Sequence, residues 1–193
     1  SFPTRRSSDL AGVPITGLDL SRAMLDVFRD NLKDEAREVR ERISIVEADM
    51  ADFELGRTFS LIVIPFRSFQ HLIRTREQIA CLECVCRHLE PGGRFILDVF
   101  NPNLEMLVDD QYLEEFGKEP EFTMPDGRVI VRTSRIAKRD WMGQVNHCEL
   151  IYNVRYPDGK RERIVHAFPM RYLFRYEVEH LIERCGMEFE TVY

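Results

Sequence analysis

The segment from Ile15 to Ser21 constrains the fold most, because it has the pattern of a buried strand that turns at once into a helix. An apolar run leads to Asp19, and Ser21 is a typical helix N-cap. Apolar residues then recur at helical spacing, at Met24, Leu25, Phe28 and Leu32. We therefore predict a parallel strand with a carboxylate at its end, followed by a helix to about Arg40.

Three more segments have the composition of parallel strands, and helical patterns separate them. They are Ile43–Glu47, Leu61–Ile64 and Arg94–Val99. Thr75 and Gln78 form a capping box for a helix through Leu89. Strands separated by helices predict an α/β fold, with a Rossmann-like parallel sheet and helices on both faces.

After a helix expected at about 103–116, the period changes from helical to alternating. Two Pro-Asp-Gly turns, at 125–127 and 157–159, predict an inserted antiparallel β meander over 118–168. The chain should then return to a helix at 175–185 and end in a strand at 187–193.

The predicted domains are therefore an α/β core, formed by 11–117 and 169–193, and the insert at 118–168. Residues 1–10 have no apolar period and resemble a translated sequencing adapter, so we treat them as a foreign or disordered tail.

Composition limits the classes of function. The formal net charge of −6 argues against a nucleic-acid binder, and no apolar run approaches the roughly 20 residues of a membrane span. Five cysteines without a signal peptide indicate reduced thiols and a cytoplasmic location. A small-molecule enzyme is compatible with all of these features.

Four signals, in this order and spacing, resemble the class I S-adenosylmethionine-dependent methyltransferases. They are Asp19 after one strand, Glu47–Met50 after the next, Ile64–Leu72 after the third and Leu89–Gly93 before the fourth. The insert is similar to that of small-molecule N- and O-methyltransferases. The resemblance implies S-adenosyl-L-methionine as cofactor and a small-molecule methyl acceptor.

The resemblance also implies the roles of individual residues. Those expected to bind the cofactor are Asp19, Leu20, Asp49, Met50 and Phe66. Those expected near the methyl acceptor are His71 as candidate base, Gln70 beside it, and Arg67 and Asn101 as substrate-binding residues. Methyl transfer needs mainly alignment, because the donor is already activated, and a base helps only if the acceptor must lose a proton.

Each of these residues also has a structural interpretation that the sequence leaves open. Asp19 would suit a helix start, and Asp49 is common in turns that follow strands. His71 would suit a packing position, and Arg67 a surface one.

The sequence has no Gly-x-Gly-x-Gly loop, which in this family follows a strand that would precede residue 11. We expect the first and seventh strands of the family's sheet to be missing, so that the chain is a fragment, inactive by itself, of an active parent. An alternative is a non-catalytic module that acts through binding or dimerisation of the insert.

Two further patterns suggest other chemistry. Cys81, Cys84 and Cys86 are spaced closely enough to suggest zinc, but one helix would point them in different directions, so we expect core residues. Tyr156 and Lys160 match the Tyr-x-x-x-Lys spacing of NAD(P)-dependent short-chain dehydrogenases. A Pro-Asp-Gly turn between them prevents a shared helix face.

Overall fold

The computed structural model describes residues 12–117 and 119–193, so the predicted tail at 1–10 lies outside the described residues. The chain divides into two compact units. The first contains the residues up to Phe66, Thr75–Asp98 and His180–Tyr193, and the second contains Arg67–Arg74 and Val99–Glu179. The predicted insert lies within the second unit.

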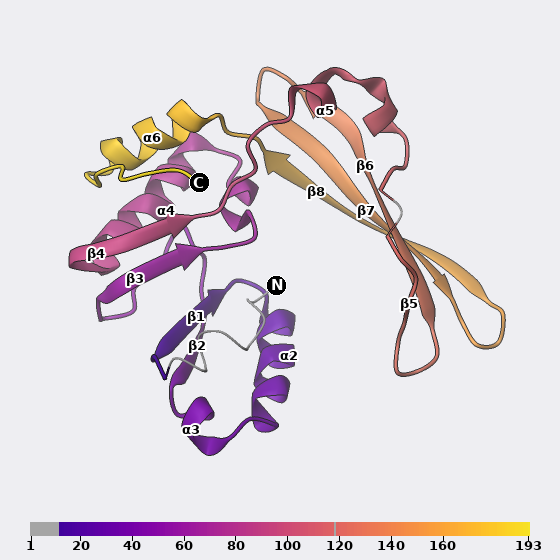
Figure 1. The fold of residues 1–193 in the computed structure, drawn as a ribbon, viewed down its shortest axis with the longest axis horizontal. Helices are drawn as coiled ribbons and strands as arrows, with labels where there is room; N and C mark the ends of the chain where they lie inside the picture. The colour runs from indigo at the N-terminus through magenta and orange to yellow at the C-terminus, as the bar shows by residue number, and fades with distance from the viewer. Residues whose placement is uncertain (1–11, 118) are drawn as a thin grey trace. The chain divides into compact units, whose positions relative to one another are not determined.

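The first unit holds the parallel strands and the helices that follow them (Figure 1). Its elements are β1 (Ile15–Asp19), α2 (Arg22–Lys33), α3 (Arg37–Arg40), β2 (Ile43–Glu47), β3 (Phe59–Ile64), α4 (Thr75–His88) and β4 (Leu89–Leu97). β1 pairs in parallel with β2, and β3 pairs in parallel with β4. In the described part of the chain these are two separate two-stranded sheets. The predicted α/β class with parallel strands is confirmed.

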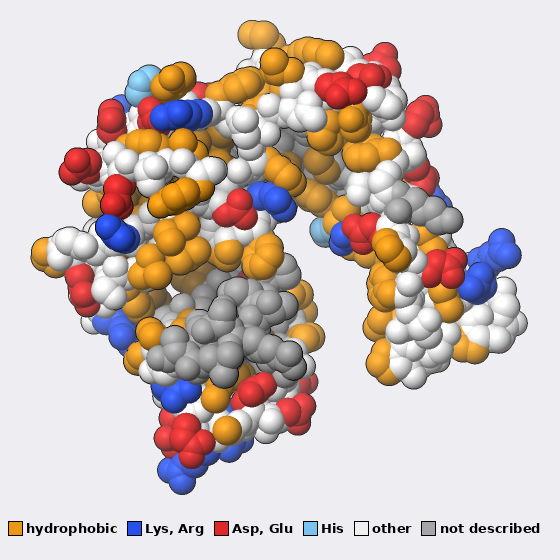
Figure 2. All heavy atoms as spheres, in the orientation of Figure 1, with side chains coloured by type: hydrophobic (Ala, Val, Ile, Leu, Met, Phe, Trp, Pro, Cys, Tyr) orange, Lys and Arg blue, Asp and Glu red, His pale blue; other side chains and the backbone are white. Residues whose placement is uncertain are grey.

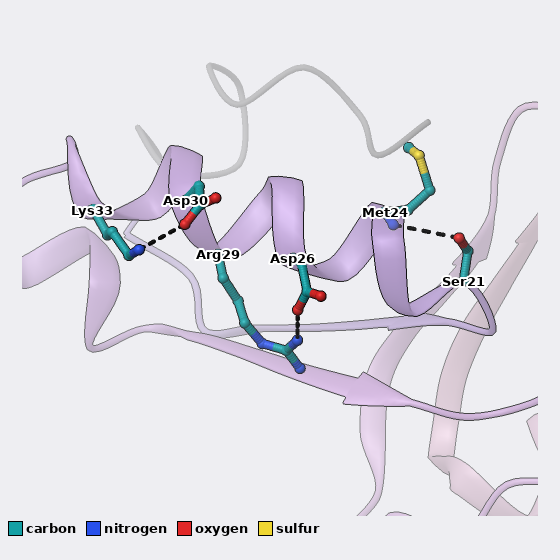
Figure 3. A network of polar contacts seen from close by, with 6 residues as sticks. All are labelled: Ser21, Met24, Asp26, Arg29, Asp30 and Lys33. Carbon is teal, nitrogen blue, oxygen red and sulfur yellow. Dashed lines mark hydrogen bonds and ion pairs between the residues drawn. The ribbon is translucent and has the colours of Figure 1, made fainter.

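The turn from β1 into α2 forms as the sequence predicts (Figure 3). The Ser21 hydroxyl accepts a hydrogen bond from the backbone N–H of Met24 at 3.4 Å. Two acid–base pairs, Asp26–Arg29 and Asp30–Lys33, lie along the exposed side of the helix. Exposed pairs of this kind contribute little stability, so the buried side chain of Leu25 does more to hold the helix on the sheet.

The second unit is built around an antiparallel sheet. Its elements are η1 (Ser68–His71), α5 (Leu104–Val108), η2 (Asp110–Leu113), β5 (Phe122–Thr123), β6 (Val129–Asp140), β7 (Val145–Arg155) and β8 (Arg161–Arg171). The strands pair in chain order, so the predicted meander is confirmed (Figure 1).

Both predicted Pro-Asp-Gly turns join neighbouring strands of this sheet. Gly127 and Gly159 have φ of +82° and +86°, which glycine adopts without strain. Asp126 and Asp158 each accept a hydrogen bond from the backbone N–H two residues ahead. The turn between β6 and β7 has no Pro-Asp-Gly signal and was not predicted.

Three predicted elements were wrong in extent or kind. The helix expected to reach Arg40 ends at Lys33 and resumes as α3, because the apolar positions that hold it on the sheet stop at Leu32. The helix expected at 103–116 is only α5 and η2. The last segment, 187–193, is not a strand, since a strand forms only against a hydrogen-bonding neighbour. α6 (Arg175–Arg184) agrees with the prediction.

Charged side chains of both signs are interspersed with apolar ones over the face shown in Figure 2. Among the described residues, no helix is long and apolar enough to cross a membrane.

Candidate functional site

Two carboxylates follow neighbouring strands at one edge of the first unit. Asp19 is the last residue of β1 and pairs in register with Glu47, the last residue of β2. Asp49 follows Glu47 by two residues. Because β1 and β2 are parallel, both carboxylates lie at the carboxyl edge of the sheet, the edge at which α/β sheets bind ligands.

Each carboxylate uses one oxygen to hold its own turn. Oδ1 of Asp19 accepts a hydrogen bond from Ser21 N–H, and Oδ1 of Asp49 accepts one from Ala51 N–H, both at 2.8 Å. Within the described residues, neither Oδ2 has a hydrogen-bond partner. A role in the local turn therefore accounts for one oxygen of each acid, and the other oxygen can accept a hydrogen bond from a ligand.

The two apolar neighbours of these acids differ in exposure. Leu20 is 69% exposed, whereas Met50 is half-buried in the turn after β2.

A side chain of α4 holds the segment that follows β2. His88 is buried; its Nε2 accepts a hydrogen bond from Leu55 N–H at 3.0 Å, and its Nδ1 lies 2.7 Å from the Cys84 carbonyl. A neutral imidazole with its proton on Nδ1 satisfies both contacts. The ring of Phe53 packs on His88 with 4.6 Å between centroids. His88 thus positions the segment that begins with Asp49 and Met50.

The backbone after β3 is strained. Phe66 and Arg67 have φ of +56° and +61°, a region that costs non-glycine residues of order 1–3 kcal/mol each. Asp98, which directly follows β4, stabilises the first of them, because its Oδ2 accepts a hydrogen bond from Phe66 N–H at 3.0 Å. Asp98 was not predicted as a site residue, although a carboxylate directly after a strand is the same signal that identified Asp19 and Asp49. The Phe66 side chain, predicted to contact cofactor, is exposed.

Gln70 is buried in the second unit, where both the nitrogen and the oxygen of its side-chain amide form hydrogen bonds. It is 1% exposed; its Nε2 donates to the Arg171 carbonyl and its Oε1 accepts from Phe100 N–H, both at 2.8 Å. These bonds join η1 to the end of β8 and to the segment that follows β4. The geometry favours a positioning role over direct contact with reactants.

Arg67 stacks on an aromatic ring in the same unit. Its guanidinium carbon lies 3.5 Å from the centroid of the Phe100 ring, a cation–π geometry. Its buried Nε has no hydrogen-bond partner among the described residues. Asn101, the other predicted substrate-binding residue, is exposed and directly follows Phe100.

His71 is exposed overall, while one side of its ring packs against β8. The ring centroid lies 5.4 Å from that of Phe168, and the imidazole is hydrogen-bonded to the backbone of Pro169. Partial burial lowers the pKa of His71, and the nearby imidazole of His166 lowers it further, against the opposing effect of the Pro169 bond. A neutral imidazole at neutral pH is suited to accept a proton.

The described residues do not support the two rival patterns. Cys81 and Cys84 are buried core residues, and no group of acids, histidines and cysteines among the described residues could hold a metal. Tyr156 and Lys160 face each other across the β7–β8 turn and not along a helix. The Tyr-x-x-x-Lys pattern therefore does not have the shared helix face that a short-chain dehydrogenase requires.

Comparison with known families gives a match over nearly half the chain. Residues 4–93 match the family described as "Methyltransferase domain". The chain is 29% identical over 179 residues to a dTDP-3-amino-3,4,6-trideoxy-alpha-D-glucopyranose N,N-dimethyltransferase of Streptomyces venezuelae. That alignment covers 90% of this chain and 66% of the relative, so the chain spans just under two thirds of the relative's length.

Solved structures show the same fold. Streptomyces venezuelae DesVI superposes with a TM-score of 0.70 at 23% identity, over 91% of this chain and 66% of DesVI. The S-adenosylmethionine-bound amino pentose methyltransferase CalS10 of Micromonospora echinaspora superposes with a TM-score of 0.67 at 22% identity, over 90% of this chain and 65% of CalS10.

Proposed function

We propose that the chain is a class I S-adenosylmethionine-dependent methyltransferase and that it serves the transfer of a methyl group from S-adenosylmethionine to an amine nitrogen of a small molecule. The amino-sugar N,N-dimethyltransferase among its relatives favours nitrogen over oxygen as the acceptor atom.

One observation carries the proposal: Asp19 and Asp49 end neighbouring parallel strands, and each keeps one carboxylate oxygen unused among the described residues. Two such acceptors at one sheet edge fit an adenosine, which offers ribose hydroxyls and an adenine amino group as donors. Asp19 would accept from the ribose and Asp49 from the adenine. Leu20 and Met50 would cover apolar parts of the ligand, and Phe66 would lie beside it.

When bound, the cofactor supplies a methyl group already activated on a sulfonium, so the chain's own residues need only hold and orient the reactants. His71 accepts the proton that the amine must lose. Arg67 and Asn101 bind the rest of the acceptor, and Gln70 keeps η1 in place.

The first test is calorimetric titration of purified protein with S-adenosylmethionine, comparing wild type with Asp19→Asn and Asp49→Asn. Asparagine keeps an oxygen for the local turn bond and removes the charge. We expect each variant to fold normally and to lose about 1.5–3 kcal/mol of binding free energy, the scale of a hydrogen bond to a charged group.

Asp126→Asn is the matched control, because Asp126 has the same kind of turn bond but lies in the turn between β5 and β6 of the antiparallel sheet. Equal affinity of all three variants and wild type would remove Asp19 and Asp49 from the cofactor site. The same titration bears on the expectation that residues 1–193 are inactive by themselves: absence of any heat with wild type would support that expectation, and saturable binding would count against it.

We further propose that β8 mediates a homodimer. It is the last strand of its sheet, and its outer edge has no strand partner among the described residues. Such edges readily pair with another chain. Sedimentation as a monomer at all concentrations would contradict this proposal.

A further inference from the structure

Two histidines flank one phenylalanine in the second unit. The ring centroids of His71, on η1, and His166, on β8, lie 5.4 Å and 5.3 Å from that of Phe168. His166 and Phe168 are two residues apart on a strand, so both side chains stand on the same face of the sheet. Both histidines are exposed and Phe168 is half-buried. We call His71, Phe168 and His166 the three-ring cluster.

The hydrogen bonding of His71 leaves one of its ring nitrogens able to accept a proton. Its imidazole is bonded to the Pro169 backbone, whose only polar group is the carbonyl, so one ring N–H is used as a donor. In the neutral ring the other nitrogen is then an acceptor. Because burial lowers the pKa of His71, its neutral ring does not repel a cationic amine at neutral pH.

The geometry points to the three-ring cluster as the subsite that binds the amino group of the methyl acceptor, with Phe168 and His166 as binding residues beside His71. This inference rests on the proposed function. An ammonium is attracted to the face of an aromatic ring, and imidazole nitrogens accept its N–H groups. Ile164, exposed two residues before His166 on the same face, offers an apolar surface for the body of the acceptor.

The proton and electron balance is complete with these groups. The ammonium gives one proton to the acceptor nitrogen of His71, which leaves a lone pair on the amine. That pair forms the new N–CH₃ bond as the S–CH₃ bond breaks, and the sulfonium becomes a thioether. His71 then releases its proton to water, to which it is exposed.

The test combines binding and kinetics on the purified protein. Histidine-labelled protein is titrated with cyclohexylamine as a probe, and the ring signals of His71 and His166 are followed by nuclear magnetic resonance. Methyl transfer to the same amine is measured for wild type, His166→Gln and Phe168→Leu. His147→Gln is the control, since His147 and Cys148 point to opposite faces and Cys148 pairs with Phe168.

We expect the amine to shift both ring signals in wild type. Phe168→Leu should raise the KM for the amine about tenfold and His166→Gln by about 3- to 10-fold, with an unchanged KM for S-adenosylmethionine and no effect of His147→Gln. The pKa of His71 should rise in His166→Gln, because a neighbouring positive charge is removed.

Absence of both ring shifts in wild type, or amine KM values within about twofold of wild type in both cluster variants, would overturn the inference. A protein that transfers no methyl group to any amine would instead refute the proposed function. The ring titration would still decide whether the cluster binds an amine.

Discussion

Replacement of Gln70 tests whether its two hydrogen bonds hold η1 in place. Gln70→Ala removes the hydrogen bonds to Phe100 N–H and to the Arg171 carbonyl. Each unsatisfied buried group costs about 1–3 kcal/mol, but the partner residues Phe100 and Arg171 are not fully buried, so we expect a loss of roughly 2–4 kcal/mol in the free energy of unfolding. For a chain of 193 residues this is a fall in Tm of about 5–15 °C.

Gln70→Met distinguishes lost hydrogen bonds from lost volume, because methionine fills a similar space without bonding. Urea unfolding should give most of the same loss for Gln70→Met as for Gln70→Ala. Gln111→Ala is the control: the Gln111 amide also donates a hydrogen bond, to Asp109, but it is exposed, so a change within about 0.5 kcal/mol is expected. A Gln70→Met protein as stable as wild type would refute the argument that these two bonds hold η1.

Three further predictions concern histidines and thiols. The folded-state pKa of His71 lies below its ordinary value of 6.5, so the unfolded chain binds more protons than the folded chain just below that pH. The free energy of unfolding should therefore fall as the pH falls through this window, and the fall should be smaller in His71→Gln. Urea unfolding at a series of pH values measures this. His88→Ala should cost roughly 2–4 kcal/mol in urea unfolding, since it leaves Leu55 N–H unsatisfied and opens a cavity; an unchanged midpoint would contradict the bonding described above. Burial raises the pKa of Cys81 to about 12. Mass spectrometry after iodoacetamide treatment near pH 8 should therefore find Cys81 unmodified after the partly exposed Cys86 and Cys185 have been alkylated. Rapid alkylation of Cys81 in folded protein would show that it is not buried.

The sequence by itself determined the features that depend on neighbouring residues. The cap at Ser21 and the glycines at 127 and 159 were identified correctly, because their hydrogen bonds close within four residues. The placement of Asp19 and Asp49 at one edge was also predictable, since parallel strands always bring their carboxyl ends together.

Only the tertiary structure decided the features that depend on remote partners. Gln70 was predicted to lie near the acceptor, but its two hydrogen bonds join it to residues 30 and 101 positions away, which no local pattern encodes. The same holds for His71, whose neighbours Phe168 and Pro169 come from β8. Segment 187–193 has strand-forming residues without a strand, because a ladder requires a partner that the segment's own sequence does not supply.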